Sequence, residues 1–210
     1  MKKLICLAVI SCCFVTPAIA TPYYFESGSG KDVWVDVEGW AGSGANESIL
    51  VVDWNIYSGP YQTESHAFGY RWDGTAYVSD MLDALHDDGV FTVSSGYGGA
   101  FLNDIVYNDG VDNHTHADQI GSWNLASTDD PYAQWGAMSG GWTTLGDWEA
   151  NQAGYDQELL ADGQLEGINA IDWFGGNPNA YFLDVPIVPE PATLALLGMG
   201  GLLLRRKRHA

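Results

Sequence analysis

The chain has 210 residues, with 27 acidic residues against 8 lysines and arginines and a formal net charge of −19. A chain of this length is expected to form one folded domain with a small appendage. Hydrophobic residues make up 46% of the sequence, including 9 tryptophans, which excludes a disordered chain. Because phosphate recognition depends on lysine and arginine, the composition also excludes nucleic acid as an expected partner.

The few basic residues are concentrated at the two ends of the chain. Between the ends only Lys31 and Arg71 are basic, whereas all 27 acidic residues fall between Glu26 and Glu190. Such an acidic surface favours solubility in salt or binding of divalent cations, and it disfavours anionic ligands. A solvated acidic face, as in secreted proteins of saline habitats, is the simpler interpretation.

Residues 1–20 have the pattern of a secretory signal peptide. Lysines at positions 2 and 3 precede an apolar run over residues 4–15, and Ala18 and Ala20 form an Ala-x-Ala cleavage site. We expect signal peptidase to cut after Ala20. The alternative is lipoprotein processing at Cys12, which would leave this cleavage site unused.

All three cysteines, Cys6, Cys12 and Cys13, lie inside this segment. After cleavage at Ala20 the protein would have no cysteine. Disulfides, thiolate catalysis and cysteine-ligated metals are then excluded, and the folded core must supply the stability.

Residues 21–187 are predicted to form an acidic extracellular domain of the β-dominated α+β class, either β-grasp-like or sandwich-like. The first strands are indicated by alternating apolar and polar residues at 33–38, 52–56 and 66–73. In the last of these, His66, Phe68, Tyr70 and Trp72 share one face. Most tryptophans are expected in the core, and Arg71 is expected in an ion pair or stacked on Tyr70 or Trp72.

One short helix is predicted after Gly74, with Ser79 as its N-cap and Gly89 as its stop. Its buried stripe would consist of Met81, Leu82 and Leu85. Further strands are expected at 91–93, 101–107 and 167–173, whereas residues 122–154 show weak periodicity and are expected to form long loops with short strands.

Three segments faintly resemble secreted domains of the transcobalamin C-terminal type. They are Gly69-Tyr70-Arg71-Trp72-Asp73-Gly74, then Asp80-Met81-Leu82, then Phe101-Leu102-Asn103-Asp104-Ile105. The resemblance covers about a third of the domain. It implies a small β-grasp-like fold and no particular ligand.

The segment from Asn108 to Asp118 gathers carboxylates and two imidazoles. Oxygen-rich loops suit Ca²⁺, and the His-x-His pattern suits a transition metal. The spacing does not match an EF-hand, and a solvated polar turn is the favoured alternative. No cofactor is expected. Binding of Ca²⁺ by this loop is kept as an alternative. The candidate metal ligands are Asp109, Asp112, His114, His116 and Asp118.

The C-terminal segment combines a proline-rich start, an apolar run and a basic end. Pro189, Glu190 and Pro191 precede an apolar stretch that ends at residue 204. We expect a transmembrane helix over about 191–204, marginal in length for the ~30 Å hydrocarbon core. The basic tail would stay cytoplasmic and place the folded domain outside; it consists of Arg205, Arg206, Lys207 and Arg208.

This order of features over residues 188–210 resembles the PEP-CTERM sorting signal of bacterial surface proteins, which is also called an ice-binding protein C-terminal domain. The resemblance implies recognition by an exosortase, with Pro189, Glu190 and Pro191 as the recognition triplet and cleavage nearby. These residues would serve processing and have no catalytic role.

The sequence therefore predicts a protein that crosses the inner membrane, is anchored there transiently, and reaches the cell surface or extracellular matrix. Signal peptidase, an exosortase and exopolysaccharide are the expected partners. We expect a non-enzymatic role in adhesion or in binding a polymer or another ligand. The alternatives are an extracellular polysaccharide hydrolase and a Ca²⁺-dependent carbohydrate-binding module. No catalytic residues are assigned, because abundant acids make any chosen carboxylate pair uninformative.

Overall fold

The computed structural model describes residues 21–54, 65–96, 101–115, 121–132, 148–150, 154–172 and 185–188. The predicted signal peptide, with its cleavage residues Ala18 and Ala20, lies outside this range, and so does the sequence from Pro189 onward. Among the described residues, no helix is long and apolar enough to cross a membrane.

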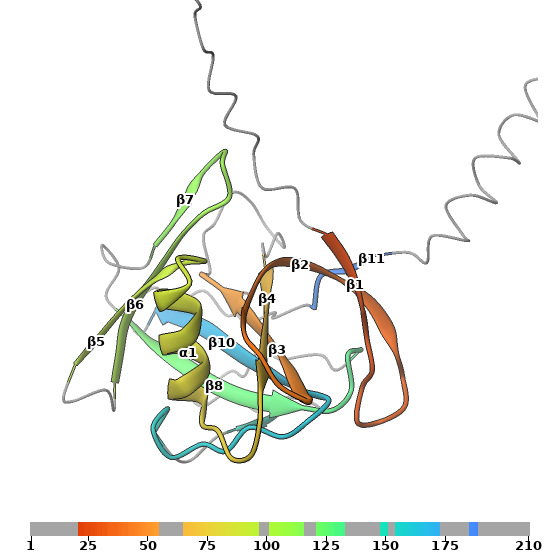
Figure 1. Cartoon of the computed structure of the whole chain (residues 1–210). Coiled ribbons are helices and arrows are strands. Elements are labelled where there is room, and N and C mark those ends of the chain that lie inside the picture. The colour runs from red at the N-terminus through yellow and green to blue at the C-terminus, as the bar shows by residue number, and fades with distance from the viewer. Residues whose placement is uncertain are drawn as a thin grey trace, which may run out of the picture.

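The described residues form a large mixed sheet with a smaller sheet and one helix packed against it (Figure 1). The large sheet has the strand order β1-β2-β4-β3-β10-β8-β9, and β11 pairs with β2. The β2–β4 and β3–β10 pairs are parallel, and the other pairs are antiparallel. Its strands are β1 (Thr21–Phe25), β2 (Val33–Gly42), β3 (Asn46–Asp53), β4 (Ser65–Trp72), β8 (Gly121–Thr128), β9 (Glu149–Ala150), β10 (Gln164–Asp172) and β11 (Ile187–Val188).

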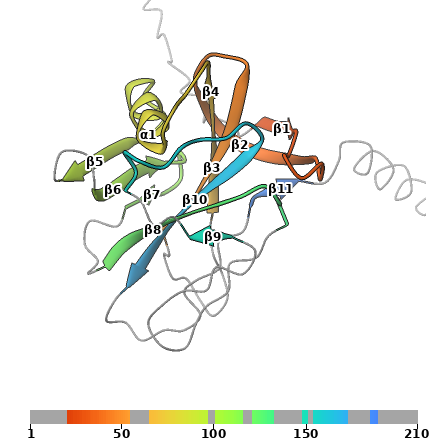
Figure 2. The same ribbon diagram turned by 90° about the horizontal axis from the view of Figure 1, so that it is seen from below.

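The smaller sheet has the order β5-β6-β7 and lies next to the helix α1 on one side of the large sheet (Figure 2). Its strands are β5 (Thr92–Gly96), β6 (Phe101–Asn108) and β7 (Asn113–His114), and α1 spans Val78–Asp87. The prediction of a β-dominated fold with one short helix is confirmed for the described residues.

The large sheet buries side chains on both faces. We call the face that packs against α1 and the smaller sheet the helix face, and its core includes Leu50, Phe68 and Ile168. The opposite face has a separate core that includes Ile49, Ala67 and Leu165. Since neighbouring residues of β3, β4 and β10 alternate between these cores, the central strands are apolar on both sides.

Two indoles attach the smaller sheet to the helix face. Trp54 follows β3 and donates a hydrogen bond from Nε1 to the carbonyl oxygen of Ile105, at 2.6 Å. Trp123 on β8 donates in the same way to the carbonyl of Asn103, at 3.2 Å. Both acceptors lie on β6, so the two tryptophans fix this strand on the large sheet by polar as well as apolar contacts.

The predicted helix is present, but Ser79 is not its N-cap. The cap is Tyr77, and Ser79 lies within the first turn. The Asp80 carboxylate accepts the backbone N–H of Tyr77 at 2.8 Å, which satisfies one of the donors that a helix start leaves free. The predicted buried stripe is confirmed, and Gly89 follows the helix with a φ of 72°, as a stop residue should.

Two strand predictions need correction. β8 is an eight-residue strand between β10 and β9, in a region predicted as long loops with short strands. The strand predicted at 52–56 instead runs from Asn46 to Asp53, and residues 55–64 lie outside the described range. Asp53, expected on a solvated face, is fully buried because β3 lies between two neighbouring strands with a core on each face.

Arg71 has the structural role that was expected, but with different aromatic partners. Its guanidinium stacks on Trp40, with Cζ 4.0 Å from the ring centroid, and pairs with Glu47 at 3.4 Å. Tyr70 and Trp72 stack on each other instead. They point to the helix face, whereas Arg71 between them points to the opposite face, so the predicted stack on these two rings is wrong.

Both chain ends of the described domain meet at β2. β1 lies along one edge of β2, with Thr21 opposite Val37. On the other edge, β11 pairs through Ile187 opposite Val35 and Val188 opposite Trp34, beyond the stretch of β2 that pairs with β4. β2 is therefore the strand that holds the first and the last described strands of the domain.

Candidate functional site

Three potential metal ligands lie together between the large and the small sheet. His66, Asp109 and His114 each contribute one donor atom to a group in which all donors lie within 4.8 Å of one another. His66 belongs to β4, Asp109 to the turn after β6, and His114 to β7. The site is thus assembled from both sheets, and we call these three residues the imidazole–carboxylate cluster.

The turn after β6 fixes the orientation of Asp109. Its Oδ1 accepts the backbone N–H groups of Val111 at 2.6 Å and Asp112 at 2.7 Å. Its Oδ2 lies 3.3 Å from Nε2 of His114. These backbone hydrogen bonds, chiefly that from Asp112, together with His114 lower the pKa of Asp109 to about 2, so the carboxylate is ionised at neutral pH.

His66 enters the cluster from the aromatic row of β4 on the helix face. Its Nδ1 lies 3.2 Å from Oε1 of Glu38. The centroids of the His66 and His114 rings are 4.5 Å apart, and both side chains are buried. Because Nδ1 faces Glu38, Nε2 of His66 is the nitrogen that can bind a metal.

Aromatic rings surround the two imidazoles. Trp54 lies 5.8 Å from His66 and 5.3 Å from His114, measured between ring centroids. Tyr107 lies nearly parallel to His114, with an interplanar angle of 19°. Burial and the nearby carboxylates of Glu38 and Asp109 raise the pKa of Tyr107 far above its ordinary value, so its hydroxyl stays protonated. The two imidazoles of the cluster are therefore enclosed by aromatic rings, whereas Asp109 is partly exposed.

The donor set of the cluster suits a transition metal better than Ca²⁺. Calcium takes six to eight oxygen ligands, whereas imidazole is a ligand of Zn²⁺, Cu²⁺, Ni²⁺ and Fe²⁺. Among the predicted ligands, the structure brings Asp109 and His114 together. Asp112 contributes backbone hydrogen bonds to the turn, and its exposed side chain is not part of the cluster. His116 and Asp118 lie outside the described residues.

His66 was not among the potential metal ligands predicted from the sequence. In the sequence, His66 shares an alternating row with Phe68, Tyr70 and Trp72. That pattern indicates a histidine buried in an apolar face and does not indicate a ligand. Glu38 was missed for a related reason, since the strand pattern of β2 placed it on the polar side. A β-bulge between Val37 and Gly39 shifts the register of β2 against β4 at Glu38.

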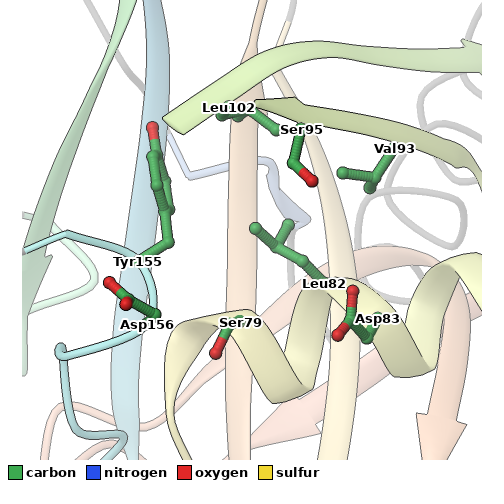
Figure 3. Close-up of a pocket in the computed structure, with 8 residues that line it drawn as sticks. All are labelled: Ser79, Leu82, Asp83, Val93, Ser95, Leu102, Tyr155 and Asp156. Carbon is green, nitrogen blue, oxygen red and sulfur yellow. The ribbon is translucent and has the colours of Figure 1, made fainter. Parts of the chain in front are cut away.

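A second hollow lies away from this cluster, between α1, β5, β6 and the turn that holds Tyr155 and Asp156 (Figure 3). Its volume is about 330 Å³, and its lining mixes apolar and polar side chains, with Asp83 and Asp156 among them. Burial raises the pKa of Tyr155, so its hydroxyl is neutral. Among the described residues, the lining of this pocket contains no cluster of potential metal ligands.

Two carboxylates elsewhere on the described surface have structural partners. Glu47 accepts a hydrogen bond from the Tyr23 hydroxyl at 2.6 Å, and Asp162 accepts the backbone N–H of Glu47 at 2.9 Å. Both acids line an open hollow of about 520 Å³ beside Gly28 and Gly163. Their hydrogen bonds hold turns and strand edges, which agrees with a solvated acidic face.

Comparison with known protein families matches residues 188–208 to the PEP-CTERM protein-sorting motif. Comparison with curated proteins gives no match to the chain. The matched segment begins at Val188 of β11 and contains the predicted triplet and basic tail, namely Pro189, Glu190, Pro191, Arg205, Arg206, Lys207 and Arg208. The chain therefore carries a PEP-CTERM sorting motif at its C-terminal end, and this motif marks it as an exported protein that an exosortase sorts to the cell surface.

Proposed function

We propose that this protein is a non-enzymatic component of the cell surface or extracellular matrix, whose acidic β-rich domain adheres to a polymer. The sorting motif over residues 188–208 is the observation that carries the proposal. Sorted export delivers the domain to a surface where polysaccharide is an available partner. Aromatic side chains exposed on the sheet provide a means of contact.

The proposal includes the order of processing. Signal peptidase cuts after Ala20, a helix over about 191–204 holds the chain transiently in the inner membrane, and the tail from Arg205 to Arg208 stays on the cytoplasmic side. An exosortase then cleaves near the triplet Pro189-Glu190-Pro191. The basic patterns at both chain ends support this orientation, because they place the acidic domain outside.

Mass spectrometry of the protein recovered from the cell surface should find Thr21 as the first residue and the segment after about Pro191 missing. The physical reason is that both predicted cleavage sites flank a folded domain, which itself resists cleavage. Replacing Glu190 by Gln should retain the chain in the membrane fraction, whereas replacing exposed Glu26 by Gln should not. Recovery of an intact arginine-rich tail on the surface form, or of a lipid on Cys12, contradicts this processing.

An aromatic pair at the edge of the large sheet supports contact with a polymer. Tyr24 of β1 and Trp34 of β2 are cross-strand partners, and their ring centroids lie 5.4 Å apart. The Tyr24 side chain is 45% exposed. The two adjacent rings, tilted by 58° to each other, offer apolar surface to sugar rings, and the tyrosine hydroxyl adds a polar edge.

The purified protein should be retained on at least one exopolysaccharide or array glycan, and Tyr24→Ala should weaken that retention about tenfold, equivalent to ~1.4 kcal/mol. Tyr132 is 60% exposed and lies on another part of the chain, so Tyr132→Ala is the matched control that should change nothing. If Tyr24→Ala is retained as strongly as the wild type, the aromatic pair does not contribute to polymer binding. Release of reducing sugar ends would instead support a hydrolase.

A further inference from the structure

We propose that His66, Asp109 and His114 form a zinc site that joins the smaller sheet to the large sheet. The proposal goes beyond surface sorting and polymer binding, and it holds or fails independently of both. It rests on the convergence of two buried imidazoles and one partly buried carboxylate. Two histidines and one carboxylate, with water in the fourth position, form a ligand set that zinc takes in proteins.

The distances fit this metal. With ligand bonds of about 2.0–2.1 Å, a tetrahedral zinc ion separates two of its donors by about 3.3 Å. The separation between Oδ2 of Asp109 and Nε2 of His114 is 3.3 Å. All three donors lie within 4.8 Å of one another, and binding of a zinc ion would draw the His66 donor toward the same spacing.

Groups around the ligands hold them in the orientation that a zinc site needs. Glu38 lies 3.2 Å from Nδ1 of His66, and a carboxylate on the far nitrogen fixes the tautomer that presents Nε2 to a metal. Asp109 uses one oxygen for the backbone N–H groups of the turn and keeps the other beside His114. The ligands are therefore oriented by the folded protein itself, which lowers the ordering cost of binding.

The position of the cluster gives the ion a structural role. His66 comes from the large sheet, whereas Asp109 and His114 come from the β6–β7 hairpin at the edge of the smaller sheet. Residues 21–210 contain no cysteine, so no disulfide can join these two parts. A zinc ion would supply the cross-link that the sequence otherwise lacks.

Calorimetric titration of the chelator-treated, purified protein with zinc chloride tests the site. We expect one zinc ion per chain and a higher melting temperature when zinc is bound. Loss of a partner outside the ligand shell typically lowers metal affinity about 10–100-fold, and this is the range expected for Glu38→Gln. His66→Gln and Asp109→Asn should lower the affinity by about 100-fold or more, because each removes a ligand.

Two matched variants serve as controls. Asp112→Asn changes a carboxylate in the same turn, and His86→Gln changes an exposed histidine on α1, so both should keep the wild-type zinc affinity. Asp109→Asn retains a side-chain oxygen for the turn, and its metal-free melting curve reports whether the fold is intact. Unchanged zinc affinity in Asp109→Asn and His66→Gln overturns the site. An equal rise in melting temperature with calcium chloride also overturns it, since that would show charge screening alone.

Discussion

Replacing Trp54 by alanine is expected to lower the free energy of unfolding by about 3–5 kcal/mol, the cost of deleting a large buried side chain. The Trp54 side chain is 1% exposed and lies in the core of the helix face. The substitution also leaves the carbonyl of Ile105 without the hydrogen bond from the indole, which adds to the cost. Urea denaturation at neutral pH measures the change.

The local loss of stability in Trp54→Ala should be greatest where Trp54 contacts the smaller sheet. Amide hydrogen exchange is therefore expected to accelerate most in β6 and β7, near Tyr107 and His114. Trp54→Phe retains an aromatic ring but removes the indole donor, and it should cost about 1–3 kcal/mol. Tyr132→Ala, at an exposed site, should stay within about 0.5 kcal/mol of the wild type. A Trp54→Ala protein as stable as Tyr132→Ala would show that the two sheets do not depend on this contact.

Glu166→Gln is expected to stabilise the protein at neutral pH, because the folded wild type must keep this buried carboxyl protonated whereas glutamine is neutral in both the folded and the unfolded state. Glu166 of β10 is fully buried between Leu50 and Ser127 in the neighbouring strands. Neither carboxylate oxygen has a hydrogen-bond partner among the described residues. Burial and the charge of Glu158 raise the pKa of Glu166 well above 4.5.

The sign of the pH dependence follows from this shift. Above about pH 4.5 the unfolded chain releases the Glu166 proton, whereas the folded protein keeps it until the pH reaches the raised pKa. The folded state then binds more protons, so the free energy of unfolding falls as the pH rises through this window. Below about pH 4.5 both states are protonated, and the group contributes no dependence on pH.

Denaturation curves at several pH values from about 4.5 upward measure this slope. Glu166→Gln should flatten it, and the difference from the wild type should vanish toward the acidic end. Glu26→Gln changes an exposed carboxylate just after β1 and should keep the wild-type slope. A slope in Glu166→Gln identical to that of the wild type would mean that another group causes the dependence.

Alternation predicted β2 and also β4, which is buried on both faces, and it failed at β8. β2 shows the regular pattern, with Val33, Val35 and Val37 buried and the residues between them partly exposed. β8 lies inside the sheet, and residues 125–128 are all buried, so apolar and small polar residues follow one another without a period. At β8 the burial of consecutive residues leaves no contrast between apolar and polar positions, on which the pattern depends.

Some residues of the candidate site could be predicted from the local sequence, and others could not. Asp109 and His114 come from one turn and a short hairpin, so local composition predicted both of them. His66 and Glu38 come from β4 and β2, and only the tertiary arrangement brings them to the hairpin. No sequence spacing between them encodes the contact. The zinc interpretation therefore needed the fold, whereas the sorting motif, a linear signal, could be predicted completely from the sequence.

The pairing of β11 with β2 determines how mechanical load enters the domain. Val188 is held opposite Trp34 in the sheet and is also the first residue of the sorting motif. At about 3.3 Å per extended residue, at most ~10 Å of chain separates it from Pro191. An exosortase that cuts near this triplet must therefore work with the folded sheet beside it. Tension on the processed C-terminus is first resisted by the two-residue ladder of Ile187 and Val188, and it then passes to β2, which carries β1 on its other edge.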